Sequence, residues 1–243
     1  MRAFLIPLIL LASCSNTTVT PLAQPEIVES IQYSSPPPKN GPIIVGVYSY
    51  LDMTGQRQGA GLSSAVTQGA ENYLIDGLKD YGGGKWFRVL ERKNVENIIK
   101  ERQIIRSAME EANSESELPS MLYAGILVEG GIVGYDANVI SGGDGVRVLG
   151  IGVSDKYTKH TVTVAIRAIS VATSEVLVSI LVEKEILSTT DNLTTTKFFD
   201  LDRKVIEIEA GTTTNEESNY AVRSAVNKAV HELVLEGISS KLW

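Results

Sequence analysis

The chain has 243 residues, of which 43% are hydrophobic and 21% are charged, a composition typical of a globular protein. Its formal net charge is −7 at pH 7, and no basic stripe runs along it, which argues against nucleic-acid binding. No apolar run reaches the roughly 18 residues that a membrane helix needs. A chain of this kind that crosses a bilayer must therefore do so as part of a closed β-barrel.

Residues 1–13 have the parts of a bacterial lipoprotein signal peptide. Arg2 supplies a positive charge, residues 3–11 form a short apolar run, and Leu-Ala-Ser precedes Cys14. This ending is similar to a lipobox, so we predict cleavage before Cys14 and attachment of diacylglycerol and an N-acyl chain such as palmitate. Ser15 follows instead of Asp, which resembles the pattern sorted to the outer membrane.

Cys14 is the only cysteine in the chain, and lipidation explains it without a disulfide. The alternative is a plain signal peptide with a coincidental cysteine. Residues 14–40 are rich in Thr, Ser, Pro and Gln, which indicates an extended, lipidated tether before the folded body. The same segment could also wrap a neighbouring subunit.

Residues 41–243 alternate strand and helix patterns, which favours an α/β domain with a mixed sheet and flanking helices. A β-branched strand at 43–51 is followed by a polar loop and a helix that ends at Gly82-Gly83-Gly84. A short strand at 86–91 precedes a helix with Val95, Ile98 or Ile99, and Ile105 on one side. The opposite side is charged, a pattern that fits either a solvated face or a subunit contact.

A β-hairpin is predicted from Gly131 to Tyr157, with a glycine-rich turn between two limbs of period two. One face of each limb is apolar, as in a strand that faces lipid on one side. An ordinary amphipathic sheet has the same alternation. The apolar positions are Tyr135, Ala137, Val139, Leu149, Ile151 and Val153.

A second hairpin is predicted from Glu183 to Gly211. Its return limb alternates Ile206 and Ile208 with acidic residues, and Phe198 and Phe199 are expected near its tip. Apolar-out, charged-in alternation suits a barrel with a wet lumen, whereas an amphipathic hairpin on a soluble core is the alternative. A last helix carries Val222, Val226, Ala229 and Leu233 on its buried side.

Catalytic and metal-binding patterns are missing from the sequence. His160 and His231 are the only histidines and lack metal-ligand spacing, so we expect no metal. The Gly-Gly-Gly-Lys run ending at Lys85 is not a phosphate loop, because Trp86 follows the lysine where Ser or Thr is required. The chain is therefore not expected to be an enzyme or to hold a cofactor beyond the lipid on Cys14.

The chain resembles the CsgG family of outer-membrane lipoprotein channels that secrete curli amyloid subunits. The resemblance covers nearly the whole chain from Gly41 onward, together with the lipobox. The matching stretches are VGVYSYLDMTGQ, SSAVTQGA, VLERKNVENIIKERQIIRSA, ILVEGGIVGYDANVISGGDGVRVLGIGVSDKY and GISSKLW.

The resemblance implies a nonameric ring in which each subunit gives two hairpins, at about 133–157 and 183–212, to a shared transmembrane β-barrel. The α/β remainder would form a periplasmic vestibule, anchored to the outer membrane of a Gram-negative bacterium. The implied function is passive secretion of unfolded curli-type amyloid subunits, with periplasmic accessory proteins. The alternative is a non-conducting lipoprotein ring that anchors a surface adhesin or appendage.

The family narrows its pore with a Tyr, an Asn and a Phe in the loop after the first strand. Here that loop is shorter: Leu62 falls at the Phe position, Gly61 at the Asn position, and the Tyr has no counterpart. With Gln58 and Gly59, the resemblance implies a less aromatic constriction. The chain also stops at Trp243, where better-known members continue, so a subunit contact made by that tail is expected to be absent or replaced.

Overall fold

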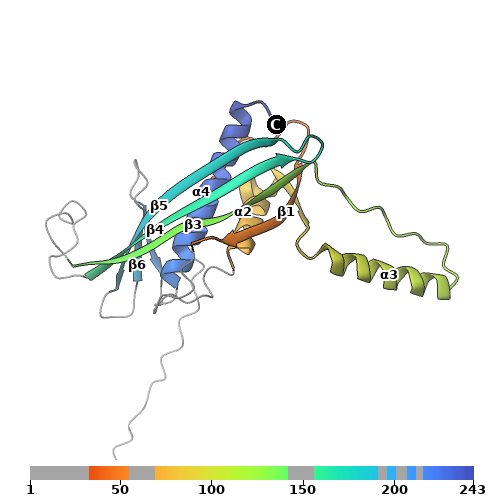
Figure 1. The fold of residues 1–243 in the computed structure, drawn as a ribbon, viewed down its shortest axis with the longest axis horizontal. Coiled ribbons are helices and arrows are strands. Elements are labelled where there is room, and N and C mark those ends of the chain that lie inside the picture. Colours follow the sequence, from red (N-terminus) through yellow and green to blue (C-terminus); the bar gives the residue numbers. More distant parts are fainter. Residues whose placement is uncertain (1–32, 55–68, 142–155, 191–195, 201–206, 212–215) are drawn as a thin grey trace, which may run out of the picture.

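The computed structural model describes residues 33–54, 69–141, 156–190, 196–200, 207–211 and 216–243. These residues form one sheet and three helices, shown in Figure 1. The strands are β1 (Ile43–Asp52), β2 (Phe87–Glu91), β3 (Ile126–Ser141), β4 (Lys156–Ser170), β5 (Val176–Thr190), β6 (Thr196–Asp200) and β7 (Glu207–Gly211). The helices are α2 (Ala70–Gly84), α3 (Val95–Glu111) and α4 (Glu216–Ser239).

The sheet has the strand order β2-β1-β3-β4-β5-β6-β7 and mixes two kinds of pairing. β1 pairs in parallel with β2 and with β3, and the crossovers that parallel strands require contain α2 and α3. From β3 to β7 every pair is antiparallel. The mixed α/β domain expected from the sequence is thus confirmed.

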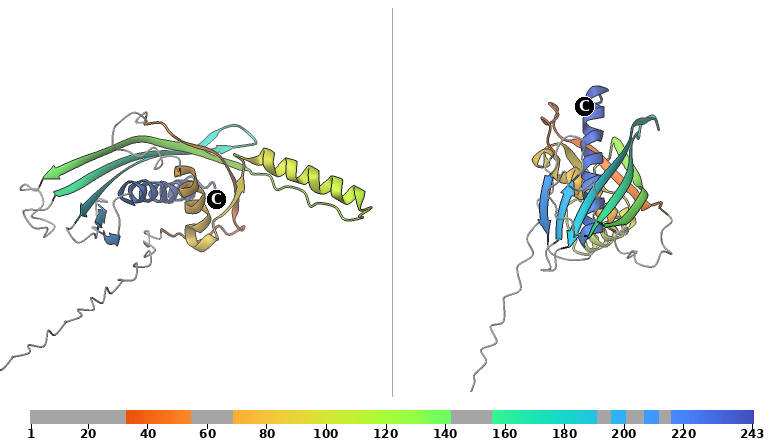
Figure 2. Two further views of the ribbon diagram at one scale, coloured as in Figure 1. Left: turned by 90° about the horizontal axis from the view of Figure 1, so that it is seen from below. Right: turned by 90° about the vertical axis from the view of Figure 1, so that its left-hand side faces the viewer.

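Helix α4 lies along the inner side of the curved sheet, as Figure 2 shows. The four residues predicted for its buried side, Val222, Val226, Ala229 and Leu233, are at most 1% exposed. Small residues at other positions of the helix, such as Ala221 and Ala225, are also fully buried. Because α4 contacts β4, β5 and α2, it forms the centre of the hydrophobic core.

Helix α2 buries Ala70, Leu74 and Leu78 against that core. The helix ends because Gly82 and Gly83 adopt a left-handed backbone conformation, with φ of 59° and 69°. The predicted termination of this helix is therefore confirmed. Gly82 is also packed closely, because an added Cβ would lie 2.5 Å from Cδ1 of Trp86.

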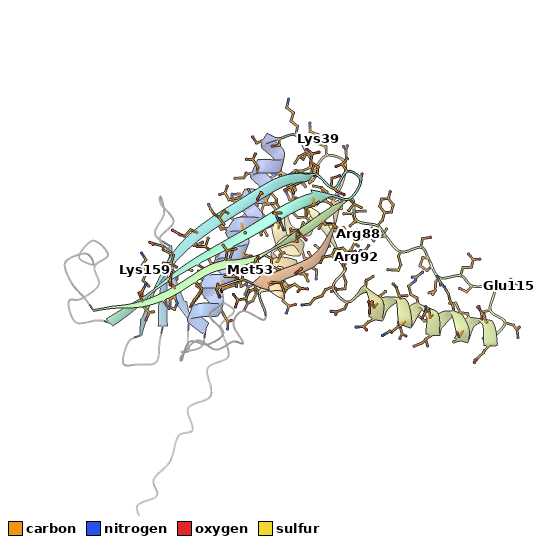
Figure 3. All side chains as sticks on the ribbon, viewed as in Figure 1. Lys39, Met53, Arg88, Arg92, Glu115 and Lys159 are labelled. Atoms are coloured by element: carbon orange, nitrogen blue, oxygen red, sulfur yellow. The ribbon has the colours of Figure 1, made fainter. Side chains whose placement is uncertain are left out.

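Helix α3 extends away from the body of the protein (Figure 1) and contains no buried residue. On its predicted apolar side, Ile98 is 36% and Ile99 is 44% exposed in the single chain. Two arginines bond to the segment that returns from α3. Arg102 donates to the Pro119 carbonyl oxygen at 2.7 Å. Arg92, labelled in Figure 3, donates to the Leu122 carbonyl oxygen at 2.7 Å. The one-sided isoleucine pattern of the sequence thus marks a face that this subunit leaves uncovered.

In the part of the chain that the structure describes, no helix has both the length and the hydropathy needed to cross a membrane.

Candidate functional site

The longest strands of the sheet form a ribbon that is the main candidate for function. β3 has 16 residues, and β4 and β5 have 15 residues each. At about 3.3 Å per residue, each strand spans roughly 50 Å, whereas the mean strand of a globular protein has about 5–6 residues. Figure 1 shows the three strands side by side over their length.

A β-bulge divides β3 where the register shifts between Ile132 and Gly134. The additional residue shifts the alternation of side chains between the two faces, so that Ile132 and Tyr135, three residues apart, both lie on the buried face. Just before the bulge the backbones are tightly packed: a Cβ added at Gly130 would overlap the carbonyl oxygen of Ala165. Glycine is therefore required where β3 passes its neighbour.

Tyr135 was expected to face lipid, but in this chain it is only 6% exposed. Its hydroxyl lies 2.9 Å from Nδ1 of His160, which is also buried. The reason is that Tyr135 lies on the same face of the sheet as the core residues of β4, such as Val162. Ala137, two residues further along the same face, is exposed. The face is therefore covered at Tyr135 and open beyond it.

The opposite face of the ribbon carries charges that pair across strands. Nζ of Lys159 on β4 lies 2.5 Å from Oε1 of Glu185 on β5 (Figure 3 labels Lys159). Nη2 of Arg167 on β4 lies 2.8 Å from Oε1 of Glu129 on β3. Asp136 is exposed on the same face. The ribbon is amphipathic, although its less polar face also contains the buried Lys184 and His160.

The second ribbon differs from the expected two-limbed hairpin between 183 and 212. β6 lies between β5 and β7 and pairs with both. Phe198 and Phe199, which were expected near a hairpin tip, belong to this middle strand. The segment therefore contributes three strands to the sheet, because an additional reversal precedes β6.

The register also separates two positions that the sequence analysis assigned to one lipid-facing set. Cα pairing places Ile208 in one row with Phe199, Leu187, Lys159 and Asn138. Neighbouring rows alternate between the two faces, and the next row contains Val139. Val139 and Ile208 therefore belong to adjacent register rows of opposite parity, and their assignment to one lipid-facing set stays a prediction.

The remaining predicted positions lie outside the described residues. They are the lipidation site Cys14, the constriction residues Gln58, Gly59, Gly61 and Leu62, and the positions Leu149, Ile151, Val153 and Ile206. Among the residues that the structure does describe, no cluster of His, Cys, Asp and Glu could hold a metal ion.

A phenol that sequence reasoning did not single out is buried at the far end of β1. Tyr50 is 3% exposed, and its hydroxyl has no hydrogen-bond partner among the described residues. Burial raises the pKa of this phenol well above its ordinary value. Nothing in the sequence marks it, because alternation alone does not show which tyrosine hydroxyls find partners.

The comparisons with known proteins place this fold in a class of assembly and transport components. A family model described as "Curli production assembly/transport component CsgG" matches residues 27–243. The chain belongs to this CsgG family, and it is accordingly a transport and assembly component and not an enzyme.

Curated relatives with that same description support the assignment. Those from Salmonella typhimurium and Escherichia coli K12 are each 36% identical over 250 residues, covering 98% of this chain and 89% of the relative. Among solved structures, the PelC dodecamer from Paraburkholderia phytofirmans is similar over 85% of this chain and 97% of its own, with 15% identity and a TM-score of 0.34.

Proposed function

We propose that this chain is an outer-membrane lipoprotein that assembles with copies of itself into a channel for unfolded, curli-type amyloid subunits. The observation that carries the proposal is the amphipathic ribbon of β3, β4 and β5, in a chain that belongs to the CsgG family. A ribbon with one less polar face and one face of paired charges matches the needs of a barrel wall between lipid and water.

Self-association follows from the strand edges. Backbone donors and acceptors on the outer strand of a sheet invite pairing, and none can stay unpaired in lipid. Among the described strands, β7 is the outer one on one side of the ribbons, and on the other side β3 beyond Ile132 pairs with β4 alone. The isoleucines exposed on α3 give a second surface that a neighbouring copy would cover. A ring of nine subunits, as the resemblance implies, would supply both partners.

The N-terminus provides the anchor in this proposal. Acyl chains on Cys14 would hold the protein in the outer membrane, with the α/β body in the periplasm. Residues 15–32 would then connect the lipid to Tyr33, the first residue that the structure describes. Accessory proteins would contact the periplasmic end of the ring.

Export through such a ring would be passive. The chain belongs to a family of transport components, and its sequence contains no phosphate loop to couple nucleotide hydrolysis to movement. The driving force would be the concentration of the exported polypeptide and the entropy of its confinement. The segment from Gln58 to Leu62 would form the narrowest part of the pore and act as its gate.

Planar-bilayer recording of the purified, assembled protein tests this function. We expect a large, weakly selective conductance that decreases when Leu62→Trp narrows the pore, together with a loss of amyloid-subunit secretion in cells. Rings that electron microscopy shows to be intact but that carry no current would refute the channel. Loss of surface attachment with secretion unchanged in Leu62→Trp would instead identify a non-conducting anchor.

A further inference from the structure

Residues 33–35 cross the junction of α2 and α4, and three contacts fix their path. The Tyr33 ring stacks on the His231 ring, with centroids 4.6 Å apart and 15° between the planes. The Trp86 indole Nε1 donates to the Ser35 carbonyl oxygen at 2.8 Å. The Ser35 hydroxyl lies 3.1 Å from the hydroxyl of Tyr81. This short segment thus contacts a site made by two helices and Trp86, the residue that precedes β2.

His231 lies at the centre of this site. Its Nδ1 is 2.7 Å from the Tyr81 hydroxyl, and its ring also stacks against Tyr81 with centroids 6.0 Å apart. The imidazole on α4 therefore joins the tyrosine of α2 to the tyrosine of the N-terminal segment. Tyr33 contacts His231 directly, and Ser35 contacts Tyr81, which bonds to His231.

The charged groups that face His231 come from its own helix. Lys228 and Glu232 pair at 3.2 Å, and Nζ of Lys228 lies 5.5 Å from the centre of the Tyr33 ring. The phenol of Tyr81 faces the ring from α2, and residues 33–38 bring the phenol of Tyr33 but no charged side chain. Burial lowers the pKa of His231 below its ordinary value, Glu232 raises it and Lys228 lowers it.

We propose that residues 33–35 dock on α2 and α4 through the neutral ring of His231, and that protonation of this ring releases them. Docking covers the imidazole, whereas release returns it to water. Because the released state takes up a proton more readily, docking is favoured above the ordinary histidine pKa of about 6.5 and weakens as the pH falls below it. His231 is thus a proton-sensitive positioning residue for the N-terminal segment.

Release would change how far the body can move from its lipid anchor. With Cys14 lipidated, the tether would end at Tyr33 in the docked state and at Ile43, the start of β1, in the released state. Those ten additional residues add about 33 Å of extended chain. This consequence rests on the lipidation proposed above. The docking itself does not, so failure of one can be told from failure of the other.

Trp86 reports on docking, because it is 1% exposed and bonds to the segment. In a Trp243→Phe background it is the only tryptophan of the full-length chain. Acrylamide quenching of its fluorescence, measured on detergent-extracted protein between about pH 8 and about pH 5, is expected to rise about threefold with a midpoint below about 6.5. A quenching constant that does not change with pH would overturn the proposal.

Variants assign the effect to His231. His231→Phe keeps a ring that stacks on Tyr33 but cannot titrate, so its quenching should be independent of pH. A pH-dependent rise that persists in this variant would assign the effect to His160, the other histidine, and would refute the proposal. Tyr33→Ala should raise quenching already at pH 8 with unchanged circular dichroism, whereas Ser34→Ala, at the exposed neighbouring position, should not. Equal quenching in these last two variants would show that the segment does not dock.

Discussion

Trp243 packs directly on Gly237, so closely that a Cβ added to the glycine would overlap the indole ring. The indole Nε1 donates to the Val234 carbonyl oxygen at 3.2 Å, and the ring meets Phe87 edge to face with centroids 6.4 Å apart. The last residue of the chain thereby closes the end of α4 against the start of β2. Glycine at position 237 leaves the space that this contact needs.

Gly237→Ala should therefore expel Trp243 and lower the stability of the body. Overpacking of this kind costs about 1–3 kcal/mol in the free energy of unfolding, which urea titration followed by circular dichroism can measure. Gly125→Ala is the matched control, because a Cβ added there meets nothing within 4 Å. Equal stability of the two variants would mean that the indole does not rest on Gly237.

Substitution by phenylalanine is expected to change the stability of the protein in opposite directions at two buried tyrosines. The Tyr50 hydroxyl has no hydrogen-bond partner among the described residues, whereas the Tyr135 hydroxyl lies 2.9 Å from Nδ1 of His160. Tyr50→Phe should stabilise the protein by about 1 kcal/mol, because it removes a buried polar group that makes no bond. Tyr135→Phe should destabilise it by about 1–2 kcal/mol, because the hydrogen bond between the phenol and the imidazole is lost. Urea unfolding of the two variants gives the comparison, and effects of the same sign would contradict it.

The buried phenol of Tyr50 is also expected to lower the free energy of unfolding in alkali. Burial raises the pKa of its phenol in the folded state above the unfolded value of about 10. The folded state then holds the proton more tightly, so the stabilisation is fully present below about pH 10 and is lost as the pH rises above it. The free energy of unfolding should fall more steeply above about pH 10 in the wild type than in Tyr50→Phe. Parallel curves for the two proteins would show that this phenol is not the buried group concerned.

The elements of the body were predictable where local patterns and burial coincide. The apolar spacing on α4 and the glycine run after α2 are each explained by contacts within this subunit. On α3 the same spacing predicted an apolar side but not what covers it, and the structure leaves Ile98 and Ile99 exposed. Periodicity shows that a helix has two sides, whereas only the packing of neighbouring elements shows which side is covered.

The ribbons were less predictable for a related reason. Period-two alternation places Tyr135 and Ala137 on one face, but α4 and the bulge in β3 determine that Tyr135 is buried there. In the second ribbon, β6 lies between the two expected limbs, so β7 pairs with β6 and not directly with β5. An additional reversal changes which strands are neighbours, and no local pattern reports that change.

The uncovered face of α3 predicts a defect in assembly that is separate from folding. Ile98→Lys combined with Ile99→Lys should reduce ring formation, because two charges would enter the contact proposed for the neighbouring copy. The fold of each subunit should persist, since α3 has no buried residue. Asn97→Lys combined with Ser107→Lys, at exposed positions on the other side of the same helix, is the matched control. Size-exclusion chromatography and electron microscopy measure assembly, and rings of normal yield in the double variant would exclude this face from the contact.

Val139 and Ile208 give the test of which face of the ribbons meets lipid. Their register rows are adjacent and of opposite parity, and the row of Ile208 also contains Asn138 and Lys159, whereas Val139 continues the face of Ala137. In a closed barrel the face of the Ile208 row would line the water-filled lumen and the face of Val139 would contact lipid. In assembled protein in liposomes, a cysteine at 208 should react with a charged, water-soluble maleimide at least about tenfold faster than a cysteine at 139, because thiolate formation requires water. Asn138→Cys is the control for the lumen face and should match position 208. Equal protection of 139 and 208 would support the sequence-based assignment of both to lipid and would show that assembly shifts the register of β6 and β7.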